Sequence, residues 1–225
     1  MTITNPQIVV LDPAVRTPEL EAYNFWNGVS PIPLSYHLPA ISGFSSLSEV
    51  DSATVAGVMI LGSSSSVNDE SEWQLKMDAW LRPFIDQDVP IFGFCFGHQM
   101  IAKMFGQKCR FSQPDQSKHL GFRKIKLREC LLWPKMEGEL VVSHREVIEN
   151  IPASFEILAE SQEVPFDGIR HKTKPIFGLQ SHPEVTTAFL RHQNIRDQVT
   201  ETSFDFGRFL VMSFLKFVET KAKQA

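Results

Sequence analysis

The chain has 225 residues, of which 43% are hydrophobic and 21% are charged, and its formal net charge at pH 7 is −4. This composition is typical of a globular protein and excludes wholesale disorder, and the lack of a dense Lys/Arg cluster gives no support to nucleic-acid binding. No apolar run reaches the roughly 18 residues that a membrane-spanning helix needs, so we expect no membrane association.

Apolar and amphipathic segments alternate along the first half of the chain. Their periodicity predicts strands at 7–11, 55–61 and 89–94, and helices at 17–26, with Thr17 as N-cap, at 70–86 and at 97–105. Short strands are expected at 122–127, 139–142, 155–159, 166–170 and 176–180, followed by a helix at 202–219. We therefore predict one α/β domain over residues 1–225. Its sheet is mainly parallel and flanked by helices on both faces, with a short-strand antiparallel excursion.

A cysteine lies between two glycines where the strand at 89–94 meets the next helix, in the sequence Gly93-Phe-Cys95-Phe-Gly97. This arrangement is the thiol counterpart of the Gly-x-Ser-x-Gly nucleophile elbow, whose tight turn leaves no room for flanking side chains. The turn is expected to aim the thiol at solvent, and the free N–H groups of the helix favour the thiolate. Cys95 is therefore a candidate nucleophile. The alternative is a small hydrophobe at the end of a core strand.

The last predicted strand ends in His182-Pro-Glu184. Residues i and i+2 of a strand project to the same side, so the Glu184 carboxylate can orient the His182 imidazole. Nucleophile, base and orienting acid are the three roles of a covalent catalytic triad. Active sites of parallel sheets lie beyond the carboxyl ends of the strands, which is where both Cys95 and His182 are expected.

These motifs resemble those of the class I glutamine amidotransferases, the glutaminases that use a cysteine triad. Residues 90–101 fit the family's nucleophile signature, and residues 178–184 are similar to its Gly-Val-Gln-Phe-His-Pro-Glu box, with Ser181 in place of the usual aromatic residue. Residues 60–70 resemble the family's oxyanion loop, and residues 142–152 its Ser-His segment. Within the family, the nearest resemblance is to the glutaminase half of GMP synthase.

The resemblance implies hydrolysis of the glutamine side-chain amide through a thioester on Cys95, giving glutamate and ammonia for transfer to an acceptor. It also implies an oxyanion hole made by the backbone N–H groups of Ser63 and Phe96. Ser63 stands where the family usually has a second glycine, so its N–H serves only if its dihedrals suit a residue with a side chain. The alternative for residues 63–66 is a plain flexible loop. The resemblance assigns substrate binding to four residues: Gly62, Gln99, Ser143 and His144.

The sequence contains no His-Glu-x-x-His, Cys-x-x-Cys or phosphate-loop motif, so we expect no metal and no cofactor. We also expect no ATP-using synthase half beside this domain. We therefore expect L-glutamine, or another γ-glutamyl amide, as substrate and a separate synthase or acceptor protein as partner. A free-standing γ-glutamyl hydrolase and a catalytically silent regulatory module remain as alternatives. Three cysteines at irregular spacing argue against a disulfide framework and indicate the cytoplasm.

Overall fold

The computed structural model describes residues 3–195 and 201–224. The strands in chain order are β1 (Gln7–Leu11), β2 (Leu34–His37), β3 (Val55–Ile60), β4 (Ile91–Phe94), β5 (Cys109–Phe111), β6 (His119–Leu127), β7 (Met136–His144), β8 (Glu146–Ile148), β9 (Phe155–Glu160), β10 (Gly168–His171) and β11 (Ile176–Leu179). The helices are α1 (Leu20–Val29), α2 (Pro39–Ser42), α3 (Ser45–Ser48), α4 (Glu72–Asp86), α5 (Phe96–Met104), α6 (Thr187–His192) and α7 (Asp205–Gln224), with 3-10 turns at η1 (Ser52–Thr54), η2 (Val67–Asp69) and η3 (Glu201–Phe204).

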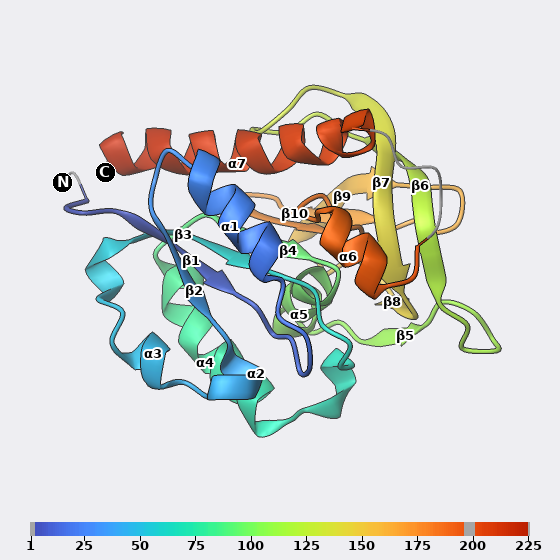
Figure 1. Ribbon diagram of the computed structural model, residues 1–225, viewed down its shortest axis with the longest axis horizontal. Coiled ribbons are helices and arrows are strands. Elements are labelled where there is room, and N and C mark those ends of the chain that lie inside the picture. The colour runs from blue at the N-terminus through green and yellow to red at the C-terminus, as the bar shows by residue number, and fades with distance from the viewer. Residues whose placement is uncertain (1–2, 196–200, 225) are drawn as a thin grey trace.

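A nine-stranded mixed sheet forms the centre of the protein, in the order β2-β1-β3-β4-β11-β10-β9-β6-β7 (Figure 1). Neighbouring strands from β2 to β11 are parallel, and those from β11 to β7 are antiparallel. The predicted α/β class is confirmed. The antiparallel strands extend the same sheet and form a larger part of it than the sequence suggested. β4 and β11 lie in register, with Phe94 opposite Leu179, so the segments that follow them leave the sheet at the same level.

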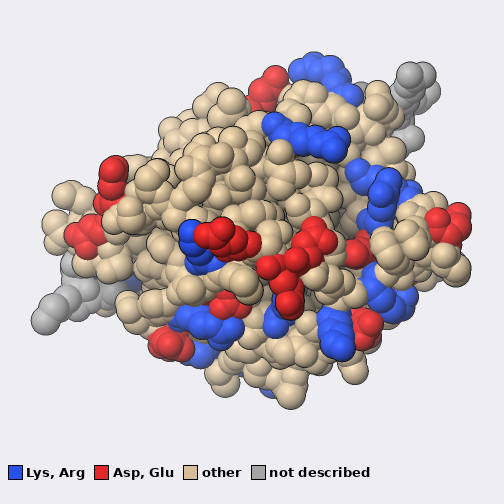
Figure 2. All heavy atoms as spheres, turned by 90° about the horizontal axis from the view of Figure 1, so that it is seen from below, with Lys and Arg blue, Asp and Glu red and all other residues tan. Residues whose placement is uncertain are grey.

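Helices cover both faces of the sheet, as the alternation of segments predicts. Helices α1 and α7 pack on one face, where Trp26, Phe92 and Phe214 belong to one buried cluster (Figure 1). Helices α4 and α5 pack on the other, where Met77 and Met100 belong to a second. None of the described helices combines the length and the apolar composition of a membrane-spanning segment. On the face seen in Figure 2, basic and acidic side chains are interspersed.

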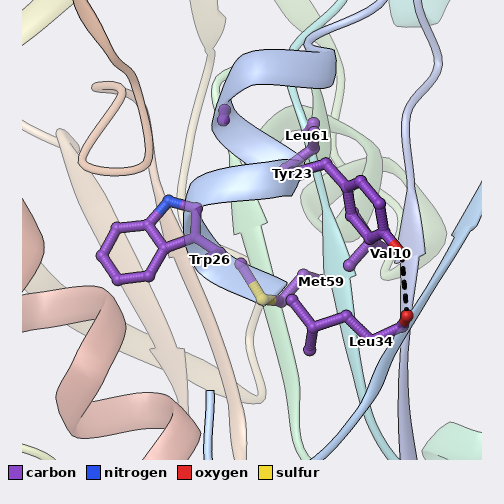
Figure 3. A pocket seen from close by; sticks show the side chains of 7 residues that line it. Val10, Tyr23, Trp26, Leu34, Met59 and Leu61 are labelled. Carbon is purple, nitrogen blue, oxygen red and sulfur yellow. Dashed lines mark hydrogen bonds between the residues drawn. The ribbon is translucent and has the colours of Figure 1, made fainter. Parts of the chain in front are cut away.

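Helix α1 packs over β1, β2 and β3, and a small apolar cavity of about 10 Å³ lies between the helix and these strands (Figure 3). The Tyr23 hydroxyl donates a hydrogen bond of 3.0 Å to the carbonyl oxygen of Leu34, which joins α1 to β2. Trp26 on the same helix is 3% exposed, so its ring is a fixed part of the core. Its indole nitrogen reaches the functional site described below.

The predicted start of the first helix at Thr17 is wrong, because α1 begins at Leu20 with Glu19 as its N-cap. The physical cause lies at the end of β1. The buried carboxylate of Asp12 accepts hydrogen bonds from the N–H groups of Ala14 (2.9 Å) and Glu19 (2.7 Å). These bonds hold the intervening residues as a loop, and that loop later forms one wall of the cleft.

Candidate active site

Cys95 occupies a strained turn between β4 and α5. Its backbone has φ 49° and ψ −100°, a left-handed conformation that costs a residue with a side chain about 1–3 kcal/mol. The Cys95 N–H donates a 2.8 Å hydrogen bond to the carbonyl oxygen of Leu179, which fixes the turn against the end of β11. Such strain persists only where the surroundings enforce it, and it marks this turn as a candidate nucleophile elbow.

Both flanking glycines are required by close backbone packing. A Cβ atom on Gly93 would lie 2.4 Å from the carbonyl carbon of Gly97, and a Cβ atom on Gly97 would lie 2.3 Å from the carbonyl oxygen of Ile60. The expectation that the turn aims Cys95 at solvent is wrong, since this residue is only 4% exposed. The tight packing that the glycines allow also buries the thiol, which lies at the bottom of a cleft.

His182 and Glu184 form a buried pair just beyond the end of β11. His182 Nδ1 lies 2.9 Å from Glu184 Oε1, and the two side chains are 4% and 2% exposed. The segment is anchored from two sides. The His182 N–H donates to the carbonyl oxygen of Val141 on β7, and Trp26 Nε1 donates to the carbonyl oxygen of Glu184, both at 2.8 Å. The carboxylate is therefore positioned to orient the imidazole, as the i, i+2 spacing predicted.

Burial disfavours the charged form of His182, but the negative charges of the Cys95 thiolate and of Glu184 outweigh it and raise the pKa of His182 to about 10. The imidazole is therefore protonated at neutral pH when the thiolate is present. His182 Nε2 has no hydrogen-bond partner in the part of the chain that the structure describes. It remains available to exchange a proton with a bound molecule.

Gly62 marks the point where Cys95 and His182 meet. A Cβ atom on Gly62 would lie 2.6 Å from His182 Cε1 and 3.7 Å from Cys95 Cβ. The structure thus brings the three predicted triad residues together, and it places the loop after β3 directly against them.

We expect Gly62→Ala to lower kcat of the amide hydrolysis that the motifs predict by about 10²-fold, because the new methyl group displaces the His182 ring and a shift of about 1 Å costs that much. Gly28→Ala is the matched control, since a Cβ atom there meets nothing within 4 Å. Steady-state ammonia release and thermal unfolding of both variants test this. Full activity of the Gly62 variant would show that the His182 ring can shift away from the new methyl group without loss of catalysis.

A cleft of about 660 Å³ opens above Cys95. Of the residues predicted from the sequence, those that line it are Gly62, Ser63, Cys95, Gln99, Ser143, His144, His182 and Glu184. The side chain of Phe96 does not line the cleft. It is 1% exposed, and its ring centroid lies 5.6 Å from that of Trp73. The backbone N–H of Phe96 belongs to the first turn of α5, where N–H groups have no acceptor within the helix.

The serine loop after β3 is held by side-chain hydrogen bonds. Ser63 Oγ donates to the carbonyl oxygen of Pro13 at 2.7 Å and accepts from the N–H of Ser65 at 3.2 Å. Ser66 Oγ donates to Glu146 Oε2 at 2.7 Å. Ser63 does not adopt a positive φ, so a residue with a side chain is accommodated there without left-handed strain. These contacts argue against the alternative of a plain flexible loop.

The other predicted substrate contacts use their polar atoms within the protein. Gln99 Nε2 donates to the carbonyl oxygen of Glu146 at 2.8 Å, and Ser143 Oγ donates to Gln193 Oε1 at 2.9 Å. His144 Nε2 accepts from Arg123 at 2.8 Å. Burial and the charge of Arg123 lower the pKa of His144 to about 2, so this imidazole is neutral.

Sequence reasoning missed several residues of the site. Gln180 is fully buried, and its Nε2 atom lies 3.6 Å from Cys95 Sγ; its place two residues before His182 was the available signal. Glu19 lines the cleft, and burial together with the charge of Glu184 raises the pKa of Glu19 to about 7. Within the described ranges, no group of three or more His, Cys, Asp or Glu residues is arranged to hold a metal ion.

Comparison with known families gives this geometry a context. Residues 38–202 match the family model described as glutamine amidotransferase class-I. The chain belongs to this family. Members of this family are enzymes that hydrolyse the side-chain amide of glutamine.

Relatives of the chain include both long and short proteins. The chain is 33% identical over 147 residues to a glutamine-hydrolyzing GMP synthase subunit of Methanobrevibacter smithii, a match that covers 62% of the chain and 70% of the relative. It is 29% identical over 170 residues to the glutamine-hydrolyzing GMP synthase of Borreliella burgdorferi, which covers 74% of the chain but only 30% of that longer protein. A glutamine amidotransferase of Thermotoga maritima has the same fold, with a TM-score of 0.74, 14% identity and coverage of 96% and 98% of the two chains.

Proposed function

We propose that Cys95, His182 and Glu184 are the catalytic triad with which this glutamine amidotransferase hydrolyses glutamine. The observation that carries the proposal is the buried 2.9 Å contact of His182 with Glu184 beside a cysteine held in a strained strand-to-helix turn. The negative charges beside His182 raise its pKa to about 10, so its imidazolium can hold the proton that the reaction hands to the leaving group. A thiolate beside this imidazolium supplies both a nucleophile and a proton donor at neutral pH.

In the first half of the reaction, the Cys95 thiolate attacks the side-chain carbonyl carbon of glutamine and a carbon–sulfur bond forms. Negative charge moves to the carbonyl oxygen, where the N–H groups of Ser63 and Phe96 stabilise it. His182 gives its proton to the amide nitrogen, the carbon–nitrogen bond breaks, and ammonia leaves. The product on the enzyme is a glutamyl thioester.

In the second half, the neutral imidazole of His182 takes a proton from water, and the resulting hydroxide attacks the thioester. The carbon–sulfur bond breaks, glutamate leaves, and the thiolate and the imidazolium are restored. Glu184 keeps the imidazole oriented and stabilises its charged form in both halves. The assembled triad argues against the alternative of a silent regulatory module.

We also propose that the ammonia is used by a separate synthase protein. The relative from Methanobrevibacter smithii is called a subunit, which supports this assignment. The free-standing hydrolase of other γ-glutamyl amides remains the second candidate, and one observation favours it. The cleft of about 660 Å³ is of the size that holds drug-sized ligands, which are larger than glutamine. The three free cysteines support a reducing compartment, the cytoplasm.

Ammonia released before a synthase takes it up is wasted, so we expect the isolated chain to hydrolyse glutamine weakly. Adding the synthase partner should raise turnover at least about tenfold, roughly 1.4 kcal/mol of barrier, by docking near residues 62–70 and shifting the serine loop to a conformer whose N–H groups point at the oxyanion. The measurement is ammonia release at saturating glutamine, with and without fractions of a cell extract from the same organism. A turnover of roughly 1–1000 per second in the pure protein, unchanged by every fraction, would favour the free hydrolase.

A further inference from the structure

The sulfur of Cys95 lies 4.0 Å from the carbonyl oxygen of Ser143, and a buried polar side chain contacts it more closely. The side-chain amide of Gln180 donates from Nε2 to Cys95 Sγ at 3.6 Å, and Gln180 has no solvent exposure. A hydrogen bond to a charged group stabilises that charge, and no water competes at a buried site. Resting on the triad proposed above, we infer that Gln180 is a catalytic residue that stabilises the Cys95 thiolate, and that Gln99 is a positioning residue that fixes the orientation of the Gln180 amide.

The orientation of the Gln180 amide decides whether it helps or harms the thiolate. An amide presents two N–H donors on one side and an acceptor oxygen on the other. If it were reversed, Gln180 would place its oxygen against the sulfur and repel the negative charge. The hydrogen bonds that Gln99 makes to Glu146 and to Gln180 exclude this reversed orientation.

Gln99 Nε2 makes two hydrogen bonds, to the carbonyl oxygen of Glu146 at 2.8 Å and to Gln180 Oε1 at 3.1 Å. A backbone carbonyl accepts only, so the Gln99 amide must turn its nitrogen towards Glu146. The same nitrogen donates its second hydrogen to Gln180, so the acceptor on Gln180 must be its side-chain oxygen. The nitrogen of Gln180 is left for Cys95. The direction of the donor at the sulfur thus follows from one fixed carbonyl group.

A buried ion pair holds that carbonyl group in place. The Glu146 oxygen also lies 3.2 Å from His144 Nδ1, and His144 Nε2 accepts from Arg123 at 2.8 Å. Arg123 in turn bonds Asp167 Oδ1 at 2.9 Å, and these two residues are 4% and 0% exposed. Because Arg123 donates to Nε2, the neutral His144 carries its proton on Nδ1 and donates it to Glu146.

The network closes on itself, because the backbone N–H of Gln180 donates to the carbonyl oxygen of Asp167 at 2.7 Å. Gln180 is therefore fixed at its backbone by Asp167 and at its side chain by Gln99. A closed, buried and hydrogen-bonded ring of this kind leaves the amide no second orientation of similar energy.

Alkylation of Cys95 by iodoacetamide measures the thiolate without using turnover. Peptide mass spectrometry separates it from Cys109 and Cys130, whose pKa values burial raises, that of Cys109 to about 12. Gln180→Met conserves volume but removes the donor. We expect Cys95 in this variant to be alkylated at least about threefold more slowly at neutral pH, and kcat to fall with little change in KM. The exposed Gln162→Met is the matched control and should react at the wild-type rate.

A double-mutant cycle tests the positioning role of Gln99. Gln99→Met should also slow alkylation, by less than Gln180→Met, and adding it to Gln180→Met should cause no further loss, because its effect passes through Gln180. A merely structural role would give additive losses and overturn the assignment of Gln99. Wild-type alkylation in a folded Gln180→Met protein would overturn that of Gln180. Should Gln180→Met not fold, Gln180→Asn keeps an amide that is too short to reach the sulfur, and the same slowing is expected.

These outcomes are distinct from failure of the proposed triad. If Cys95 of the wild-type protein reacts no faster than Cys130 at neutral pH, the nucleophile itself is wrong. If it reacts faster and Gln180→Met leaves that rate unchanged, the triad stands and the inference about Gln180 is overturned.

Discussion

Replacement of Cys95 by alanine is expected to lower kcat for glutamine hydrolysis by at least about 10⁴-fold, roughly 5.4 kcal/mol of barrier. No other thiol lines the cleft among the described residues, since Cys109 and Cys130 are absent from its walls. The protein should stay folded, because alanine removes a single sulfur atom and leaves the glycine packing of the turn unchanged. The loss in stability should be about 1 kcal/mol.

Ammonia release and thermal unfolding, measured on the same preparation, test this expectation. Cys130→Ala is the matched control. This substitution also removes one sulfur atom, but Cys130 is only partly buried and lies outside the cleft. Hydrolysis by Cys95→Ala above roughly a tenth of the wild-type rate, only about 1.4 kcal/mol of barrier, would mean that Cys95 is structural.

His182→Ala is expected to be nearly as damaging as the loss of Cys95, because no other group takes over the transfer of the proton. Glu184→Gln should be clearly milder. Its amide oxygen still accepts the hydrogen bond from His182 Nδ1, which now measures 2.9 Å, but a neutral amide stabilises the imidazolium less than a carboxylate does. The Trp26 hydrogen bond to the Glu184 backbone is unaffected by this change.

The measurement is kcat and KM for each variant, with kcat carrying the loss because these groups act after glutamine has bound. The double variant of Cys95→Ala and His182→Ala should be no worse than the worse single variant, since the two residues act as one unit. If Glu184→Gln has wild-type activity, Glu184 takes no part in the mechanism. If it equals His182→Ala, orientation alone does not explain its role.

The triad was predictable from the sequence because short motifs carry it. Two glycines around Cys95 report a backbone packed too tightly for side chains, and the spacing of His182 and Glu184 reports a shared side of an extended chain. The sheet was predictable for a similar reason, since buried strands such as β3 and β4 are continuous apolar runs.

The supporting network was not predictable, because its contacts join residues far apart in the chain. Gln180 and Cys95 are separated by 85 positions, and Arg123 and Asp167 by 44. No periodicity or local motif encodes such a pairing. The error at the start of α1 has the same origin, since a carboxylate seven positions earlier in the chain captures the Glu19 N–H and overrides the local preference of Thr17. Strands as short as β5 and β8 are too brief to show a period.

Trapping the acyl-enzyme shows whether Cys95 carries the glutamyl group during turnover. Wild-type protein is quenched in denaturant during turnover of glutamine, and its cysteine peptides are analysed by mass spectrometry. We predict a glutamyl group on the peptide that contains Cys95, removed by hydroxylamine as a thioester is, and none on the peptides that contain Cys109 or Cys130. Release of ammonia at the full rate while Cys95 stays unmodified, or a glutamyl group on another residue, would show that Cys95 is not the nucleophile.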